Sequence, residues 1–238
     1  MSRTRAAWEE EAGGWIEWAR APELDHTFWG FNLPALMDLV PPPGRLTVDI
    51  GCGEGRVGRE LIRRGHVVVG VEGSEALAAA ARAAEPSFEV HVGDARRLPL
   101  GDAVADLAIA SMSLLNIDAM PEAVAEVARV LEPGGRFCFS LVHPQNSARP
   151  LGDHPDAGTY FAEYGYAEER ERAGRRMTFH DIHRPLSVYA GALEGAGLLI
   201  EMLREPVPGE AYLAEHPEME KWTRKPCFLH VRALKRRR

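Results

Sequence analysis

The sequence is poor in cysteine and in long apolar runs, and both shortages narrow the class of protein. Only three of its 238 residues are cysteine, and the spacing of Cys52, Cys138 and Cys227 fits neither a disulfide framework nor a zinc site. Cys52 and Cys138 lie inside apolar stretches, so we expect them to be small core residues. No apolar run reaches the ~18 residues that a membrane span needs, and residues 1–11 lack the apolar stretch of a signal peptide. We therefore expect a cytoplasmic protein, and the sequence predicts no metal ligands.

An excess of positive charge is also missing. The formal net charge of −7 gives no general attraction to the phosphates of nucleic acid. Residues 235–238, Lys-Arg-Arg-Arg, are a local exception that is typical of a solvated tail, with an anionic partner as the alternative. Apolar residues make up 45% and charged residues 26%, the balance of an ordinary globular protein. We expect neither a nucleic-acid nor a membrane partner, and the sequence leaves a homodimer open.

The central part of the chain alternates between short apolar runs and segments of helical periodicity. The expected strands are residues 46–50, 66–71, 88–92, 105–110 and 136–142, and the expected helices between them are residues 57–64, 74–84 and 121–131. A helix at 185–196 and strands at 197–204 and 227–234 follow, the last of them expected to pair antiparallel. Strands that alternate with helices imply parallel pairing with right-handed crossovers. The predicted fold class is α/β: a doubly wound, mainly parallel seven-stranded sheet whose last strand is antiparallel.

Two segments lie outside this alternation. Trp8 and Trp15 recur at helical spacing within residues 4–20 and are expected to pack one amphipathic helix on the core. Residues 1–40 are therefore predicted to form an N-terminal helical cap. Residues 144–184 are too long for an unstructured loop, so we predict a hairpin insertion after the fifth strand, with arms at 166–172 and 175–182, acting as a substrate lid. Residues 41–143 and 185–238 form the predicted core.

The most informative motif is Val-Asp-Ile-Gly-Cys-Gly-Glu-Gly at residues 48–55, where an expected strand runs directly into three alternating glycines and then a helix. Glycines let the backbone approach a ligand without a Cβ in the way, and ligands of open α/β sheets lie at the carboxyl ends of the strands. A nicotinamide dinucleotide site would need a third glycine where Arg56 stands. The chain also lacks a Tyr-x-x-x-Lys pair, so a nicotinamide-dependent reductase is the disfavoured alternative. The glycine spacing suits S-adenosylmethionine, which has no pyrophosphate to seat.

Acidic residues follow the next two expected strands. Glu72 ends the second strand, about 20 residues after the first glycine, where an acid binds the ribose hydroxyls of an adenosine. Asp94 follows the third strand in Gly93-Asp94-Ala95, and its carboxylate can accept a hydrogen bond from an adenine amino group. Each feature is common alone, but their order at neighbouring strand ends indicates an adenosine site.

Together with Leu-Glu-Pro-Gly-Gly at residues 131–135, these segments resemble the class I S-adenosylmethionine-dependent methyltransferases. The resemblance is close over residues 45–142 and loose over 186–204 and 227–234. It implies that Asp49 and the glycines lie beneath the methionine part of the cofactor, that Glu72 holds the ribose, and that Ser111 and Met112 line the cofactor. The implied cofactor-binding residues are Asp49, Gly51, Cys52, Gly53, Glu72, Gly73, Asp94, Ala95, Ser111 and Met112. One departure is Glu72, where the family more often has aspartate.

The methyl acceptor is expected to be a small molecule. Residues 111–116 lack the Asn/Asp-Pro-Pro-aromatic motif of family members that methylate an amino nitrogen of a base or a glutamine. The cap and the insertion supply the candidate acceptor-binding residues, which are Trp29, Asn32, Tyr160, Tyr164 and His180. An acceptor hydroxyl or amine must lose a proton, and histidine has a pKa near neutrality. His143 or His183 is therefore the predicted base or orienting group.

The residues leave several alternatives open. They do not separate O-, N- and C-methylation. A non-catalytic S-adenosylmethionine-binding protein would carry the same glycine loop, and an RNA methyltransferase would rest on the basic tail alone.

Overall fold

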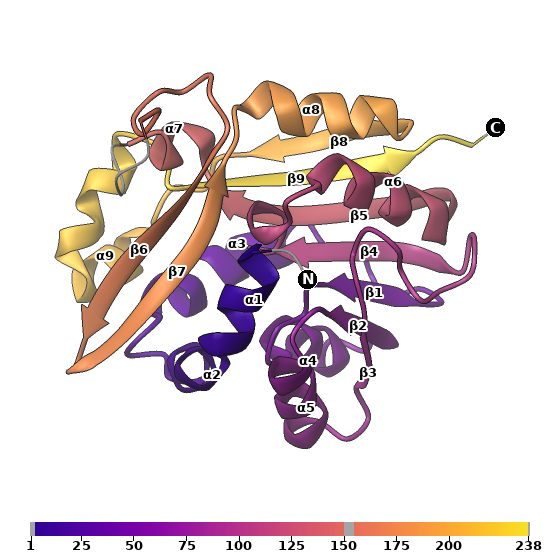
Figure 1. Ribbon diagram of the computed structural model, residues 1–238, viewed down its shortest axis with the longest axis horizontal. Helices are drawn as coiled ribbons and strands as arrows, with labels where there is room; N and C mark the ends of the chain where they lie inside the picture. The colour runs from indigo at the N-terminus through magenta and orange to yellow at the C-terminus, as the bar shows by residue number, and fades with distance from the viewer. Residues whose placement is uncertain (1–2, 150–154, 238) are drawn as a thin grey trace.

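The computed structural model describes residues 3–149 and 155–237, and its centre is a seven-stranded sheet (Figure 1). The strands are β1 (Thr47–Ile50), β2 (Val68–Glu72), β3 (Glu89–Val92), β4 (Ala105–Ser111), β5 (Leu131–Val142), β8 (Leu198–Arg204) and β9 (Phe228–Lys235). Their order is β3-β2-β1-β4-β5-β9-β8, in which β1 to β5 pair in parallel and β9 runs antiparallel to both of its neighbours. This confirms the predicted α/β fold class, including the antiparallel last strand.

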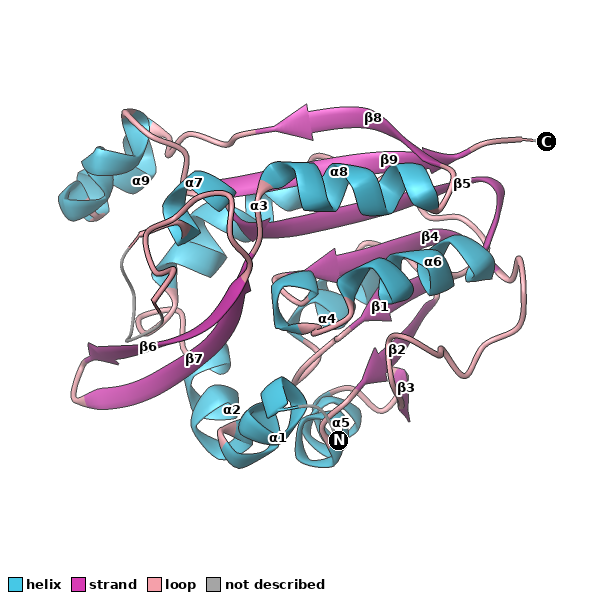
Figure 2. Ribbon diagram, turned by 45° about the horizontal axis from the view of Figure 1, so that its top comes forward, coloured by secondary structure: helices cyan, strands magenta, loops and turns pink. Residues whose placement is uncertain are grey.

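Helices cover both faces of this sheet (Figure 2). The covering helices are α3 (Leu33–Met37), α4 (Arg56–Arg63), α5 (Glu75–Ala84), α6 (Met120–Val130) and α8 (Leu186–Gly195). Alternate strand residues face opposite ways, so Leu107 and Ile109 pack with α3, α4 and α5, whereas Ala108 and Ala110 pack with α6 and α8. Cys52, Cys138 and Cys227 are buried and free, which confirms the first two as small core residues.

The N-terminal segment forms two helices where the sequence predicted one. They are α1 (Arg3–Glu10) and α2 (Ala12–Arg20), separated at Glu11. Gly13 and Gly14 lower the helix propensity just after this point. The Trp8 and Trp15 rings meet edge to face, with their centres 5.5 Å apart. A π-helical turn, η1 (Phe28–Asn32), leads directly into α3.

The predicted hairpin is present as a separate two-stranded sheet of β6 (Tyr164–Arg172) and β7 (Arg175–His183). It turns at Ala173 and Gly174, which both have positive φ angles. Its strand β7 lies beside the N-terminal helices α1 and α2 (Figure 1), where the Phe179 ring contacts Trp15 and Trp18. Short elements complete the fold: η2 (Leu114–Asn116), α7 (Pro144–Ser147), α9 (Glu210–Glu215) and η3 (Pro217–Thr223). The sequence did not predict α9 and η3.

The boundaries of the cap, core and insertion stay predictions. Residues 150–154 of the predicted insertion, residues 1–2 of the cap and the last residue of the basic tail lie outside the described residues. Within the described ranges, the helices are all too short or too polar to cross a bilayer.

Candidate active site

A cavity of about 660 Å³ lies at the carboxyl ends of β1, β2, β3 and β4. That is the edge where a parallel sheet presents a ligand, and the volume is typical of a small-molecule site. The ten residues that the sequence predicted for the cofactor all line this cavity: Asp49, Gly51, Cys52, Gly53, Glu72, Gly73, Asp94, Ala95, Ser111 and Met112. Residues from four successive strand ends are thus brought together at one wall.

The glycine turn after β1 is held in a conformation that favours glycine. Gly51, Gly53 and Gly55 have φ angles of +65°, +58° and +88°, in the left-handed region that costs other residues energy. A Cβ on Gly51 would lie 2.6 Å from the Cβ of Ser113. The Ser113 hydroxyl in turn donates to the carbonyl of Ile50 at 2.6 Å, so the turns after β1 and β4 are packed directly together.

Glu72 ties the glycine turn to the next strand end. Its carboxylate accepts hydrogen bonds from the backbone N–H of Gly53 at 2.7 Å and of Ser74 at 2.9 Å. Burial raises the pKa of Glu72, while these backbone bonds oppose the rise. Each carboxylate oxygen can accept a second bond, so Glu72 can still bind a diol.

Asp49 is a buried acid whose Oδ2 has no hydrogen-bond partner in the described protein. Burial, and then the nearby charge of Glu72, raise the pKa of Asp49 to about 7. A buried carboxylate oxygen without a partner is costly, and a cationic or hydrogen-bond-donating ligand in the cavity would satisfy it.

Asp94 lies at the outer end of the same wall. Its pKa is lowered, chiefly by the hydrogen bond from Arg96, with which it forms a 2.6 Å ion pair. An adenine amino group would therefore share this carboxylate with Arg96.

These residues fit S-adenosylmethionine better than a dinucleotide. S-adenosylmethionine carries a sulfonium cation, which the carboxylates of Asp49 and Glu72 would attract. A pyrophosphate is an anion, so the same two carboxylates would repel it. The glycine that a dinucleotide site has at the start of the following helix is also missing. That position holds Arg56, whose guanidinium pairs with Asp25 at 2.7 Å.

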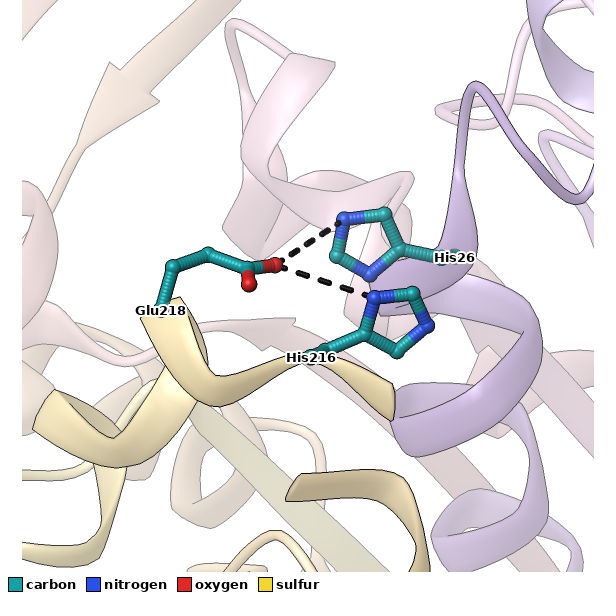
Figure 3. Close-up of side chains that lie close together, drawn as sticks. All are labelled: His26, His216 and Glu218. Atoms are coloured by element: carbon teal, nitrogen blue, oxygen red, sulfur yellow. Dashed lines mark ion pairs between the residues drawn. The ribbon is translucent and has the colours of Figure 1, made fainter. Parts of the chain in front are cut away.

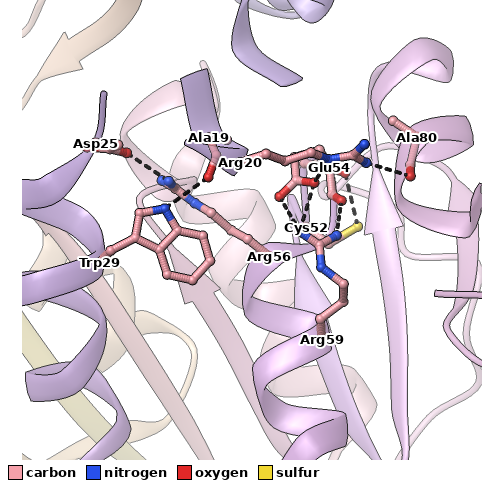
Figure 4. Close-up of polar contacts among 10 residues, drawn as sticks. Ala19, Arg20, Asp25, Trp29, Cys52, Glu54, Arg56, Arg59 and Ala80 are labelled. Atoms are coloured by element: carbon pink, nitrogen blue, oxygen red, sulfur yellow. Dashed lines mark hydrogen bonds and ion pairs between the residues drawn. The ribbon is translucent and has the colours of Figure 1, made fainter. Parts of the chain in front are cut away.

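Arg56 joins the core to the N-terminal cap (Figure 4). Its guanidinium lies 3.3 Å from the Phe28 ring centre and 4.7 Å from the Trp15 ring centre. Glu54, two residues before Arg56, is paired with both Arg20 and Arg59, each at 2.7 Å. The cap is thus fastened over the glycine turn by the mostly buried Arg56–Asp25 pair and by the half-exposed Arg20, which pairs with the buried carboxylate of Glu54.

The rest of the cavity, here called the outer chamber, is enclosed by the cap, the hairpin, α7 and η3. Its lining includes Asn32, Asn116, Asn146, Arg149, Glu168, Arg170, Phe179, Asp181, Trp222 and Phe228. Asn116 donates through Nδ2 to Asp181 Oδ1 at 2.8 Å and to the His180 carbonyl at 2.7 Å. Polar groups on a partly aromatic wall are typical of a site that orients a small ligand.

Sequence reasoning missed the charged residues of the outer chamber. In β7, Met177, Phe179, Asp181 and His183 alternate on one side of the strand. The sequence signal for Asp181 was an acidic residue at a position where this alternation favours an apolar side chain. Arg149, Glu168 and Arg170 carried no comparable signal, because charged residues are frequent throughout this hairpin.

Of the five predicted acceptor-binding residues, the structure brings only Asn32 to the cavity. Trp29 instead donates to the carbonyl of Ala19 at 3.0 Å, and Tyr164 donates to the Ser147 carbonyl at 3.4 Å. Tyr160 accepts from the backbone N–H of Leu186 at 3.2 Å, and the ring of His180 faces Glu11 at 3.9 Å. These four side chains hold the cap and hairpin in place, so we no longer assign them to the acceptor.

Neither predicted catalytic histidine lines the cavity, and both use their ring nitrogens within the protein. His183 is fully buried, with Nδ1 at 2.7 Å from the Ser147 hydroxyl and Nε2 at 2.9 Å from the Tyr160 carbonyl. Since that carbonyl only accepts, Nε2 carries the proton and Nδ1 accepts from Ser147. His143 Nδ1 accepts from the Gln145 N–H at 3.1 Å, and its Nε2 faces Glu205 at 2.9 Å.

The histidine prediction is therefore corrected, and a substitution checks the correction. His183→Ala is expected to lower the free energy of unfolding by about 2–4 kcal/mol, because it opens a cavity and leaves the Tyr160 carbonyl unpaired. The kcat of the folded variant should stay within about threefold of wild type. Denaturant unfolding and turnover below the melting temperature measure the two effects. A large loss of kcat with unchanged stability would restore a catalytic role.

A cluster of His26, His216 and Glu218 fastens α9 and η3 to the cap (Figure 3). Glu218 lies 3.8 Å from His26 Nε2 and 3.7 Å from His216 Nδ1. The two rings stack with centres 4.0 Å apart and planes 11° apart. Lone pairs of imidazole lie in the ring plane, so parallel rings do not point at one metal ion at the ~2 Å distance that zinc needs. We describe the cluster as a clamp at the edge of the outer chamber.

Comparison with known proteins agrees with this geometry. A model described as "Methyltransferase domain" matches residues 48–139. The ubiquinone/menaquinone biosynthesis C-methyltransferase UbiE of Caulobacter vibrioides is 30% identical over 190 residues, covering 72% of this chain and 74% of that protein. The malonyl-[acyl-carrier protein] O-methyltransferase of Serratia marcescens is 32% identical over 111 residues, covering 47% and 43% of the two chains.

A solved structure gives the same assignment. An S-adenosylmethionine-dependent methyltransferase from Mesorhizobium loti superposes with a TM-score of 0.70 at 28% identity, covering 91% of this chain and 99% of that one. The chain belongs to the class I S-adenosylmethionine-dependent methyltransferases, and its reaction is methyl transfer to a small molecule. The reductase alternative is thereby set aside.

Proposed function

We propose that the ten cavity residues predicted for the cofactor, here called the cofactor wall, bind S-adenosylmethionine. We propose that the methyl acceptor occupies the outer chamber. One observation carries this proposal: a single cavity joins the glycine turn and the acids at the strand ends to a chamber enclosed by the cap and the hairpin. The names of the two curated relatives specify C- and O-methyl transfer, which supports an acceptor with an oxygen or carbon nucleophile. The net charge of −7 and a chamber bounded by the cap and the hairpin support a small-molecule acceptor rather than a nucleic acid.

The geometry supports a role for each of these residues. When bound, S-adenosylmethionine supplies a methyl group already activated by its sulfonium. The glycine turn admits the methionine part, Asp49 stabilises the cation, Glu72 accepts from the ribose, and Asp94 with Ala95 meets the adenine. The outer chamber holds the acceptor in line and excludes water, and orientation of this kind can lower the barrier by about 7–11 kcal/mol. The cavity is lined by described residues of one chain, so a homodimer is compatible with the proposal but not needed for it.

Calorimetric titration and a labelled-methyl screen test this proposal. S-adenosylmethionine and S-adenosylhomocysteine should both bind with micromolar affinity, whereas NADH should give no heat. A screen of phenols, carboxylates and amines with methyl-labelled cofactor should label at least one acceptor. Tight cofactor binding without labelling of any acceptor would favour a non-catalytic binding protein instead.

The raised pKa of Asp49 predicts that cofactor binding depends on pH. With a pKa of about 7, the Asp49 carboxylate is roughly one-tenth ionised at pH 6 and nine-tenths ionised at pH 8. The ionised form attracts the sulfonium cation, so the affinity for S-adenosylmethionine should rise by up to about tenfold over this range. S-adenosylhomocysteine, which lacks that charge, should show a smaller rise. Calorimetry at both pH values measures the change.

The matched variant is Asp49→Asn, which cannot ionise. It should bind S-adenosylmethionine more weakly at pH 8 and lose most of the pH dependence. An unchanged pH dependence in this variant would show that Asp49 is not the titrating group.

A further inference from the structure

The carboxylate of Asp181 can accept hydrogen bonds from a molecule in the outer chamber. Its Oδ1 accepts from Asn116 Nδ2 at 2.8 Å, and its Oδ2 is 3.4 Å from the Tyr166 hydroxyl, a long contact. A carboxylate has about four acceptor positions, so capacity remains on both oxygens. The residue lines the cavity, and the exposed part of its side chain can therefore meet a bound molecule.

Asn116 places this carboxylate close to the cofactor wall. It ends η2, which follows β4 after Ser111 and Met112, two of the residues of the cofactor wall. Met112 has a φ of +56°, a left-handed conformation that is costly for a side chain of this size and is found at functional sites. The strained turn and the Asn116 bonds hold Asp181 at the junction of the two halves of the cavity.

Two arginines and one glutamate accompany Asp181 on the wall of the outer chamber. Glu168 lies between two arginines, 3.2 Å from Arg149 and 3.0 Å from Arg170. Arg149 Nε has no hydrogen-bond partner in the described protein. Tyr166 and Tyr189 also face Asp181, and burial raises the pKa of both, so they remain neutral hydroxyls. Once Asp181 has taken up a proton, the two arginines outnumber Glu168, and such surroundings favour an oxyanion over an ammonium ion.

Aromatic side chains form the apolar part of the same chamber. Phe179, Trp222 and Phe228 line it, and the Arg170 guanidinium lies 4.9 Å from the centre of the Phe179 ring. A planar ligand can pack against these rings while its polar edge faces Asp181 and the arginines.

We propose that Asp181 is the catalytic base and that the acceptor is an aromatic or enolic hydroxyl compound. The inference rests on the proposed function. The hydroxyl proton moves to an Asp181 oxygen. The electron pair of the oxygen, or of the ring carbon conjugated with it, forms a bond to the methyl carbon as the S–CH₃ bond breaks. When carbon is the nucleophile, the proton on that carbon afterwards moves to the oxygen and restores the hydroxyl. That bond's electron pair stays on sulfur and gives S-adenosylhomocysteine, and the proton then leaves Asp181 for water.

The ionisation of Asp181 suits this role. Burial raises the pKa of Asp181 to about 6, against the opposing hydrogen bond from Asn116 and the charge of Arg170. The carboxylate is therefore mostly ionised at pH 7 yet more basic than an exposed aspartate, as general base catalysis requires.

The test uses the full chain with S-adenosylmethionine and three hydroxyl probes, 1-naphthol, catechol and 4-hydroxybenzoate, beside the amine probe tryptamine. We expect methyl transfer to at least one hydroxyl probe and none to tryptamine. Asp181→Asn should lower kcat by at least 100-fold with the S-adenosylmethionine affinity within twofold of wild type. The matched control is Glu169→Gln, an exposed acid on the same hairpin that pairs with Arg176, which should behave as wild type.

The pH profile separates a base from a structural residue. The wild-type kcat/KM should decrease as the pH is lowered past 6, which gives the pH profile an acidic limb. The Asp181→Asn variant should lack this acidic limb. Asn116→Ala removes a hydrogen bond that lowers the Asp181 pKa, so its limb should move to higher pH.

Three results would overturn the inference: an Asp181→Asn variant with the wild-type kcat and pH limb, methylation of tryptamine alone, or no methylation of any hydroxyl probe. Absence of S-adenosylmethionine binding by the wild-type protein would instead refute the proposed function.

Discussion

Replacing Arg56 with alanine is expected to lower the free energy of unfolding by about 3–5 kcal/mol, because it leaves a mostly buried carboxylate without its partner. The Arg56 and Asp25 side chains are 9% and 13% exposed and lie 2.7 Å apart. The variant also loses the contacts of the guanidinium with Phe28 and Trp15. Urea unfolding monitored by circular dichroism measures the change.

The control for this substitution is Arg63→Ala, on the same helix. Arg63 is 70% exposed and pairs with Glu60, and exposed pairs contribute about 0–1 kcal/mol. The double variant Arg56→Met, Asp25→Asn removes both charges and should lose less stability than Arg56→Ala alone. A loss below 1 kcal/mol in Arg56→Ala would contradict the view that this pair fastens the cap.

Gly51→Ala is expected to weaken S-adenosylmethionine binding by more than tenfold. The φ of +65° costs an alanine about 1–2 kcal/mol, and its Cβ would lie 2.6 Å from that of Ser113. Relief of this clash must move the turn after β1 or the turn after β4, and both line the cavity. Calorimetry measures the affinity, and thermal unfolding should show a loss of stability of about 2 kcal/mol or more.

Gly191→Ala serves as the comparison for Gly51→Ala. Gly191 lies in α8, where an added Cβ would meet nothing within 4 Å. At an exposed helix position alanine is more favourable than glycine by about 1 kcal/mol, so this variant should be slightly more stable than wild type and should bind the cofactor with wild-type affinity. Wild-type affinity in Gly51→Ala would show that the turn does not need glycine at this position.

The sheet and its cofactor edge could be predicted from the sequence because the signals are local. The 48–55 motif, Glu72 and Asp94 each follow an apolar run, and the topology of a parallel sheet brings successive strand ends together. The hairpin could be predicted for the same reason, because Gly174 separates two runs of strand-forming residues. The helix break at Glu11 was missed because the helical spacing of Trp8 and Trp15 continues across it.

The chemistry of the outer chamber could not be predicted in the same way. Whether a histidine has a free ring nitrogen depends on partners distant in sequence, and His183 finds Ser147 and Tyr160 in two other segments. The basicity of Asp181 likewise depends on burial beneath elements that only the tertiary structure brings together. Residue type alone favoured histidine as the base, whereas the contacts favour an aspartate.

The most direct measurement is a crystal structure of the protein grown with S-adenosylhomocysteine. We predict that the ligand lies in the 660 Å³ cavity, with its ribose at Glu72, its adenine at Asp94 and its sulfur toward the outer chamber. A cavity without ligand density at saturating concentration, or a ligand bound elsewhere on the molecule, would contradict the assignment of the glycine turn as the cofactor site.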